Sequence, residues 1–496
     1  MSNANSALDA ASRAIGTSPM TGRMLLGGDL VESLGGGWMD CVNPANEDYI
    51  GRVPRGTAAD VERAVAAAET AQADWAALSV AQRSDYLMRL GDAIMKRAED
   101  ILQVEVSDTG NPITAMRNDI ASGVDRLRYF AGLGYELQGK SIPATPDNLH
   151  FTVREPYGVV GRILAFNHPI NFAIVGMASP LMAGNAVILK PSEQSPLSAS
   201  LLAEIARDIL PPGVLNILSG DAEVGNALVR HPRVKRLSFV GSARTGMAIQ
   251  RSAAEVAVKH VSLELGGKNP FIVFPDVDVD KVATAAVAGM NFTWQGQSCA
   301  STSRLFVHDD IYDAVLDRVT QKVAAIRVGD PFDPATQMGA INSAHQLRKV
   351  EHYVAAGRED GGRLVAGGKR PPGDAFRTGY WIEPTVFADV APDARIAREE
   401  IFGPVLSVLR WSDVDAVVKQ ANAVEYGLTA AVWTRDISVA LRTAQKIQAG
   451  YIWINGINAH VRAVPYGGYK NSGVGRERGI EEMFSYTEEK SIHIML

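Results

Sequence analysis

The chain has 496 residues, of which 46% are hydrophobic and 21% are charged, and its formal net charge is −6. This length exceeds what one hydrophobic core usually serves, so we expect two or three domains, and the composition is typical of a globular enzyme. The negative balance, with Lys and Arg scattered along the chain, argues against a nucleic-acid partner.

The first twenty residues are rich in Ser, Ala and Asn and lack the basic start, apolar core and cleavage site of a secretory signal. We expect a disordered tail there. No run approaches eighteen uninterrupted apolar residues, so no membrane span is expected. Two cysteines are too few for a disulfide framework, which favours a reducing compartment and a cytoplasmic location.

Two alanine-rich amphipathic helices are predicted at 58–76 and 81–105, after a turn at 43–45. The stretch 140–155 alternates polar and apolar residues, as does 489–495, so each is expected to be a strand with two different faces. Lone strands of this kind have edges to fill, and a partner subunit could fill them.

From residue 158 onward, short β-branched runs alternate with helical stretches, which is the pattern of a parallel α/β sheet. Ser195 is expected to cap the second helix of this region, with Pro196 at its first position. A second α/β set begins near Asn269, and the boundary is placed near Gly266. The expected strands are 158–166, 185–189, 214–218, 236–240, 270–274, 304–307 and 430–434, and the expected helices are 169–182, 196–210 and 310–328.

Cys299 closes the segment 295–299, Gln-Gly-Gln-Ser-Cys. A lone cysteine is commonly buried and inert, and Cys41 is assigned that structural role. The segment before Cys299 is too polar and flexible for a core strand and would present backbone N–H groups around the sulfur. Because a thiolate needs a pKa lowered by neighbouring dipoles or charge, this setting indicates a nucleophile.

Glu264 follows a β-branched run at 256–261 and precedes a double glycine. A loop glutamate is usually solvated, but apolar Leu263 and Leu265 on either side imply partial burial. Since burial raises the pKa of a carboxyl group, Glu264 is a candidate general base.

Asn167 lies in the segment 166–169, Phe-Asn-His-Pro, at the C-terminal end of an expected strand, where the ligands of α/β sheets bind. An ordinary Asx turn before proline is one use of such an asparagine. The other is donation of an amide N–H to a developing oxyanion.

These motifs, with the segments 400–404 (Glu-Ile-Phe-Gly-Pro) and 465–477, resemble the aldehyde dehydrogenase superfamily over almost the whole chain. The resemblance implies an α/β fold and a homodimer or homotetramer. Its implied parts are a Rossmann-type parallel-sheet cofactor domain at 21–137 and 156–265, a second α/β catalytic domain at 266–476, and a small β oligomerisation element at 138–155 and 477–496.

In the superfamily, the positions matching Cys299, Glu264 and Asn167 are the nucleophile, the base that activates water, and the oxyanion donor. The resemblance therefore implies oxidation of a small-molecule aldehyde to its carboxylic acid through a cysteine thiohemiacetal and thioester, with hydride passing to NAD. A CoA-acylating dehydrogenase is an alternative, against which Glu264 argues because that reaction needs no hydrolytic base. A cysteine hydrolase would need a histidine beside the thiol, and none can be assigned. A catalytically silent protein of this fold would not need the full set of residues.

The strand at 236–240 runs into a glycine turn and a helix start whose N–H groups suit pyrophosphate, although the usual Gly-x-Gly-x-x-Gly fingerprint is absent. Lys190 and Glu193 match the superfamily's contacts to the adenosine ribose hydroxyls. A carboxylate there would repel a 2′-phosphate, which favours NAD, while Lys190 can accept a phosphate, which keeps NADP open. The cofactor contacts implied by the resemblance are Phe166, Lys190, Ser192, Glu193, Gly225, Phe239, Gly241, Ser242, Leu265, Glu400 and Phe402.

Nine scattered histidines show no metal-ligand spacing, so no metal is expected. Five polar residues occupy positions that resemble the family's aldehyde tunnel, where many relatives place aromatics: His168, Asn171, Asn458, His460 and Arg462. Buried donors demand acceptors on the ligand, so we expect a polar aldehyde, with Arg462 as the partner of an anionic group. The alternative is that some of these side chains face solvent or a subunit contact.

Overall fold

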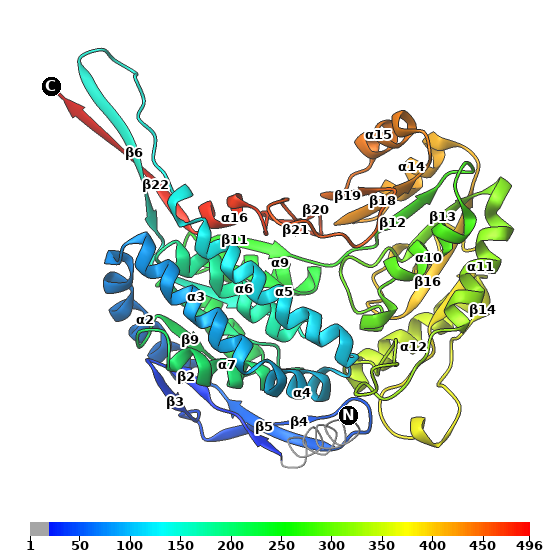
Figure 1. The fold of residues 1–496 in the computed structure, drawn as a ribbon, viewed down its shortest axis with the longest axis horizontal. Coiled ribbons are helices and arrows are strands. Elements are labelled where there is room, and N and C mark those ends of the chain that lie inside the picture. The colour runs from blue at the N-terminus through cyan, green and yellow to red at the C-terminus, as the bar shows by residue number, and fades with distance from the viewer. Residues whose placement is uncertain (1–18) are drawn as a thin grey trace, which may run out of the picture.

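Two β-sheets flanked by helices form the bulk of the molecule, seen side by side in Figure 1, in a computed structural model that describes residues 19–496. The first sheet has the strand order β21-β11-β10-β7-β8-β9-β2-β3. Strands β7 to β11 run parallel, as expected from the alternation of strands and helices. Its strands are β2 Met24–Leu26, β3 Asp29–Val31, β7 Val159–Ile163, β8 Ala186–Lys190, β9 Leu215–Ile217, β10 Val234–Val240, β11 His260–Glu264 and β21 Gly473–Val474.

Both faces of this sheet are covered, because alternate residues of each buried strand point to opposite sides. Val187 and Leu189 of β8 join one apolar cluster with helices α3 to α7, whereas Ala186 and Ile188 join a second cluster with α2, α8 and α9. These helices are α2 Ala58–Ala77, α3 Val80–Lys96, α4 Ala98–Thr109, α5 Ile113–Gly132, α6 Pro169–Met182, α7 Leu197–Arg207, α8 Ala222–Arg230 and α9 Ala243–Ala254.

The second sheet has the order β14-β15-β16-β13-β12-β18-β19 and is parallel except at β14. Helices α10 and α11 pack on one face, and α12 to α15 pack on the other. Its strands are β12 Pro270–Val273, β13 Arg304–His308, β14 Arg363–Ala366, β15 Thr385–Ala388, β16 Val405–Trp411, β18 Thr429–Trp433 and β19 Tyr451–Ile454. Its helices are α10 Val279–Gly289, α11 Tyr312–Ala324, α12 Ala344–Glu359, α13 Arg395–Arg398, α14 Val414–Asn422 and α15 Ile437–Lys446.

A two-stranded ribbon of β6 Asn148–Pro156 and β22 Thr487–Met495 projects from the first sheet (Figure 1). The strands are antiparallel, with Pro156 opposite Thr487 and Asn148 opposite Met495. The remaining strands form two small sheets. One consists of β1 Met20–Thr21, β5 Tyr49–Arg55 and β4 Gly37–Val42, and the other consists of β17 Tyr426–Gly427 and β20 Tyr469–Lys470. The last helix, α16, spans Ile480–Phe484.

Several expectations need correction. The helix expected at 81–105 is broken at Arg97, which has φ −103° and ψ 13°. Ser195 does not cap α7; Pro196 takes that position, and the Ser195 hydroxyl donates to the Phe166 carbonyl at 3.0 Å. The two lone strands pair with each other rather than with another chain. Residues 140–142 fold back onto the other edge of β6 through a bridge between Ser141 and Phe151, so the edge without a partner among residues 19–496 is that of β22.

The expected disordered tail falls on residues 1–18, outside the described residues, except for its last two positions. No helix within residues 19–496 combines the length and apolar character needed to span a membrane.

Candidate active site

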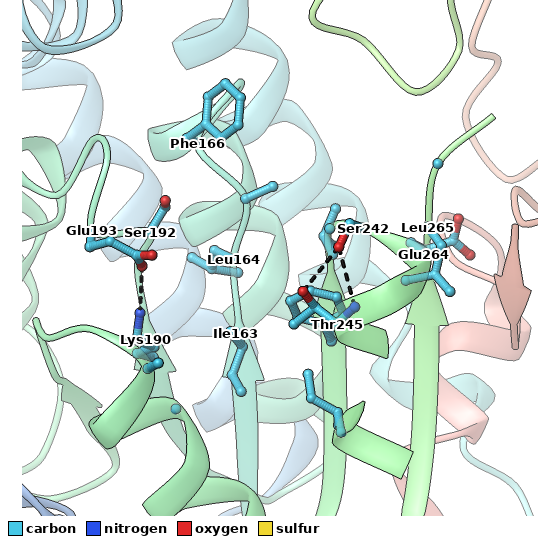
Figure 2. Close-up of a pocket in the computed structure, with 18 of the residues that line it drawn as sticks. Ile163, Leu164, Phe166, Lys190, Ser192, Glu193, Ser242, Thr245, Glu264 and Leu265 are labelled. Carbon is cyan, nitrogen blue, oxygen red and sulfur yellow. Dashed lines mark hydrogen bonds and ion pairs between the residues drawn. The ribbon is translucent and has the colours of Figure 1, made fainter. Parts of the chain in front are cut away.

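A cavity of about 510 Å³ opens where the strands of the first sheet end. It is lined by residues at the carboxyl ends of β7, β8, β10 and β11, and by loops that precede β13 and β16 of the second sheet. Figure 2 shows Lys190 and Glu193 on one side, Glu264 and Leu265 on the other, and Ser242 between them. Cys299 and Asn167 line the same cavity. The topology therefore brings together the residues that the sequence motifs single out.

Cys299 lies in the loop before β13. Its carbonyl accepts a hydrogen bond from Asn269 Nδ2 at 2.7 Å, and its Sγ lies 3.8 Å from the hydroxyl of Tyr466. Gly296 in this loop has φ 66°, and a Cβ there would stand 2.2 Å from the Gly403 carbonyl oxygen, so only glycine fits.

Burial raises the pKa of the Cys299 thiol to about 11, and the hydrogen bond from Tyr466 opposes that rise. The negative charges of Glu264 and Glu400 add to it. The expected lowering of the thiol pKa is therefore not found among the described residues. A proton acceptor close to the sulfur is required before this cysteine can react.

Glu264 is the last residue of β11 and is only 7% exposed. Neither of its carboxylate oxygens has a hydrogen-bond partner within the described residues. Burial, followed by the nearby charge of Glu477, raises the pKa of this carboxyl well above its usual range. A buried carboxyl without partners is poised to exchange protons with a ligand or a water molecule.

Asn167 is 5% exposed, and its Nδ2 donates to the Gln297 carbonyl at 2.9 Å. The Asn167 carbonyl accepts from Asn111 Nδ2 at 3.3 Å, which holds the backbone in place. Because an amide nitrogen carries two N–H groups, one remains for the cavity that Asn167 lines.

The predicted cofactor residues gather along the same cavity. Lys190 Nζ donates to Glu193 Oε2 at 3.1 Å, and the Lys190 side chain is 5% exposed while that of Glu193 is 48% exposed (Figure 2). The Ser242 hydroxyl caps α9 by accepting from Thr245 N at 3.2 Å. The helix start and the half-exposed carboxylate thus face a common space.

Glu400 and Phe402 reach the cavity from the loop before β16. Glu400 Oε1 accepts from the backbone N–H of Gly267 at 2.9 Å, and a Cβ on Gly266 would lie 2.2 Å from Glu400 Oε2. The rings of Phe166 and Phe402 stand edge to face with centroids 5.7 Å apart. The double glycine after Glu264 is therefore needed for close approach of the Glu400 carboxylate.

Sequence reasoning missed several residues of the site. Gln346 and Lys349 line the cavity from α12, a helix that was not predicted. Lys268 has a fully buried ammonium without a partner in residues 19–496, and burial lowers its pKa to about 7. Tyr466 lies in the predicted segment 465–477, so the pattern marked its neighbourhood but not its contact with the thiol.

The five residues expected in the substrate tunnel are only partly available to a ligand. Asn171 Nδ2 donates to the Asp119 carbonyl at 2.7 Å, and Asn458 Nδ2 donates to the Ala288 carbonyl at 2.7 Å. Arg462 forms an ion pair with both oxygens of Asp125 at the surface.

The other two contact neighbouring side chains, and one of them reaches a neighbour of the thiol. His168 Nδ1 lies 2.6 Å from Asp119 Oδ2, and the His460 ring packs against Tyr466 with centroids 5.3 Å apart. Thus Asn171, Asn458 and Arg462 already have partners inside the protein. The expectation of five unpaired donors needs correction.

The chain is similar to known proteins along almost its whole length. The sequence pattern of the aldehyde dehydrogenase family matches residues 31–492. Aldehyde dehydrogenase tropH of Talaromyces stipitatus is 46% identical over 464 residues, which cover 92% of this chain and 90% of that protein. An NAD+ complex of an aldehyde dehydrogenase from Bacillus cereus matches with a TM-score of 0.94 and 36% identity over 98% of each chain. The indole-3-acetaldehyde dehydrogenase AldA of P. syringae, solved with NAD+ and IAA, matches with a TM-score of 0.95 and 36% identity over 98% of this chain and 99% of that one.

Proposed function

The chain belongs to the aldehyde dehydrogenase family, and from this premise we propose that it oxidises an aldehyde to its carboxylic acid through a thiohemiacetal and a thioester on Cys299, with NAD as hydride acceptor. The observation that carries the proposal is the single cavity lined by the Cys299 thiol, the Asn167 amide and the Glu264 carboxyl. A nucleophile, an oxyanion donor and a base are the groups that this chemistry requires.

The residues along the cavity fit NAD. The start of α9 presents N–H groups that suit a pyrophosphate, and the half-exposed Glu193 carboxylate beside Lys190 suits ribose hydroxyls. The B. cereus and P. syringae structures are both described as complexes with NAD+. When bound, NAD supplies the acceptor for the hydride that leaves the adduct carbon. Because Lys190 can also accept a phosphate, use of NADP stays within the proposal.

The chain's own residues account for the remaining steps. The Cys299 thiol gives its proton to water in the cavity, and Glu264, a buried carboxyl without a hydrogen-bond partner among residues 19–496, serves as the base of the hydrolytic half. The thiolate adds to the aldehyde carbon, and the Asn167 amide and the Cys299 backbone N–H donate to the oxyanion. After oxidation, Glu264 removes a proton from water, hydroxide adds to the thioester, and the C–S bond breaks to release the acid and the thiolate.

Two rival activities make different demands on these residues. A CoA-acylating enzyme passes the acyl group to a thiol and does not need the partnerless carboxyl of Glu264. A cysteine hydrolase needs a histidine on the sulfur, whereas within residues 19–496 the side chain that contacts Cys299 Sγ is Tyr466.

The two sheets support the proposed division into a cofactor domain of residues 21–137 and 156–265 and a catalytic domain of residues 266–476, except that β21 within the second range joins the first sheet beside β11. We assign the β6–β22 ribbon an assembly role in a homo-oligomer, because the outer edge of β22 has no partner strand among residues 19–496 and Leu149, Ile494 and Met495 on the ribbon are exposed.

The test is NADH formation, followed by absorbance over a panel of aldehydes, with and without CoA and for wild type and Cys299→Ala. We expect CoA-independent NADH formation by wild type and none by the variant. NAD binding to the variant, measured by fluorescence titration, should persist because the cofactor residues are unchanged. A strict requirement for CoA, or turnover by Cys299→Ala, would contradict the proposal.

A further inference from the structure

Arg478 places a cation next to the nucleophile. Its guanidinium carbon lies 4.2 Å from the centroid of the Tyr466 ring, and the hydroxyl of the same ring lies 3.8 Å from Cys299 Sγ. Tyr466 is 4% exposed and is held among the rings of Tyr451 and His460. A small molecule can therefore span the distance between the Arg478 guanidinium and the reacting sulfur.

The Arg478 side chain lacks the partners that a buried guanidinium normally has. Its Nη1 is buried without a hydrogen-bond partner among residues 19–496, and its side chain forms no ion pair there. Its backbone N–H donates to Glu482 Oε2 at 2.7 Å, and its guanidinium contacts the face of the Tyr466 ring. A buried cationic donor left unpaired is unfavourable, and a ligand that supplies an acceptor removes this cost.

A second arginine reinforces the positive charge. Arg126 on α5 forms no ion pair within the described residues, and burial followed by the charge of Arg478 lowers its pKa to about 10. His460 is exposed to solvent, although the rings of Tyr451, Trp453 and Tyr466 crowd its imidazole. Desolvation by these neighbours, then the charges of Arg478 and Arg126, lowers the His460 pKa. The positive charges of Arg126 and Arg478 thus both bear on His460, whose ring packs against Tyr466.

The acidic side chains around the two arginines accept hydrogen bonds from other groups. Asp119 Oδ2 lies 2.6 Å from His168 Nδ1, and Glu477 Oε1 accepts from Arg162 at 3.2 Å. Glu482 Oε1 accepts from the Ser179 hydroxyl at 2.6 Å. Each of these carboxylates thus already has a hydrogen-bond donor, whereas Arg478 Nη1 has no acceptor among residues 19–496.

We propose that the aldehyde substrate carries a carboxylate at the end away from its carbonyl, and that the guanidinium groups of Arg478 and Arg126 bind this carboxylate beside Tyr466. This inference rests on the proposed aldehyde dehydrogenase function and specifies its substrate class. Two planar guanidinium groups match the oxygens of a carboxylate. The site differs from Arg462, whose charge is already balanced by Asp125.

The first test compares kcat/KM for succinic, glutaric and adipic semialdehydes with that for neutral aldehydes of equal chain length. We expect wild type to prefer at least one semialdehyde. The ratio of semialdehyde to neutral aldehyde should fall about tenfold or more in Arg478→Met and in Arg126→Met, with part of it restored in Arg478→Lys. Arg117→Met is the matched control, because Arg117 lies on α5 but pairs with Glu99 at the surface.

Three outcomes would overturn the inference. The first is a wild-type preference for the neutral aldehydes. The second is an equal fall in kcat/KM for semialdehydes and neutral aldehydes in Arg478→Met, which would mean that Arg478 acts on Cys299 and Glu264 electrostatically. The third is a ratio of semialdehyde to neutral aldehyde that changes only in Arg462→Leu.

A binding measurement separates this inference from the proposed function. Calorimetric titration of glutarate into the NAD complex of Cys299→Ala requires no turnover. We expect glutarate to bind, and to bind about tenfold or more weakly when Arg478→Met is added. If no aldehyde is oxidised but glutarate binding depends on Arg478, the proposed function fails and the anion site stands. If aldehydes are oxidised but glutarate binding ignores Arg478, the anion site fails alone.

Discussion

The hydroxyl of Tyr466 lies 3.8 Å from the sulfur of Cys299, so a phenol borders the candidate nucleophile. Burial raises the pKa of Tyr466 well above its ordinary value, which keeps the phenol a neutral hydrogen-bond donor. A donor at this position favours the thiolate over the thiol, and it partly offsets the effect of burial on Cys299.

Tyr466→Phe should make the thiol less reactive. Loss of the donor raises the pKa of Cys299 further, so alkylation by iodoacetamide at a fixed alkaline pH should slow by about fivefold, the equivalent of about 1 kcal/mol. In wild type the rate should rise with pH toward the pKa of about 11. Tyr451→Phe is the control, since its hydroxyl bonds to the Ala459 carbonyl. Equal rates in Tyr466→Phe and wild type would show that the phenol does not act on the sulfur.

Glu264→Gln should separate the two halves of the reaction. Without the base, thioester hydrolysis slows by about 10²-fold to 10⁴-fold, so a stoichiometric burst of NADH should precede a slow steady state in stopped-flow absorbance. Glu481→Gln, at an exposed position of α16, should show no burst. An undiminished steady-state rate in Glu264→Gln would exclude it as the base.

The same carboxyl should set the acid limb of the wild-type pH profile. Burial raises the Glu264 pKa, so its carboxylate form is lost as pH falls through a value well above 4.5. Steady-state turnover should decline over that range, and a burst of NADH should appear at the lower pH values, because hydrolysis is slowed and acylation is not. A turnover rate that stays level down to the ordinary pKa of a glutamate would contradict this assignment.

Glu193→Ser should increase the use of NADP. The change removes the carboxylate that pairs with Lys190 at 3.1 Å and leaves the ammonium free to bind a 2′-phosphate. We expect the ratio of kcat/KM for NAD to that for NADP to fall by about tenfold. Direct titration of both cofactors should show the same trend, and an unchanged ratio would mean that Glu193 does not discriminate between them.

Glu105→Gln should change how stability depends on pH. Glu105 on α4 is buried with Oε2 unpartnered in the described residues, and burial raises its pKa to about 8. The folded state therefore keeps a proton on Glu105 that the unfolded state releases near pH 4. The contribution of this proton to the free energy of unfolding is fully present below about pH 4 and is lost as pH rises through about 8.

The midpoint of thermal unfolding should accordingly fall less between about pH 6 and 9 in Glu105→Gln than in wild type. Glu99→Gln, an exposed change on the same helix, should follow wild type. Identical pH dependence in all three proteins would rule out the proposed role of Glu105.

The sequence predicted the parallel α/β character and most buried strands, because β-branched runs such as β8 point side chains into both flanking layers. It did not predict the break at Arg97, since neither glycine nor proline marks that position. Pairing between β6 and β22 was also missed, because alternation within a strand does not specify which strand lies beside it.

In the site, the motifs around Cys299, Glu264 and Asn167 could be recognised from the sequence. A nucleophile, a base and an oxyanion donor each require a particular residue type, and here each lies next to a glycine or at the end of a strand. The contact of Arg462 with Asp125 joins residues 337 positions apart, and that of Cys299 with Tyr466 joins residues 167 apart. No local pattern encodes such pairs. Whether a polar side chain serves the ligand or the protein thus became visible only in three dimensions.

The ribbon has a consequence for biosynthesis. His150 of β6 pairs with His493 of β22, which are 343 residues apart. At about 5 to 20 residues per second, β22 leaves the ribosome on the order of 20 to 70 s after β6. Throughout this interval the edge of β6 that later receives β22 has no partner in its own chain, while neighbouring chains on the same message expose the same edge. Charged Arg154 and Glu155 on β6 oppose premature pairing during that wait, so neutralising them should lower soluble yield more than it lowers the stability of the finished enzyme.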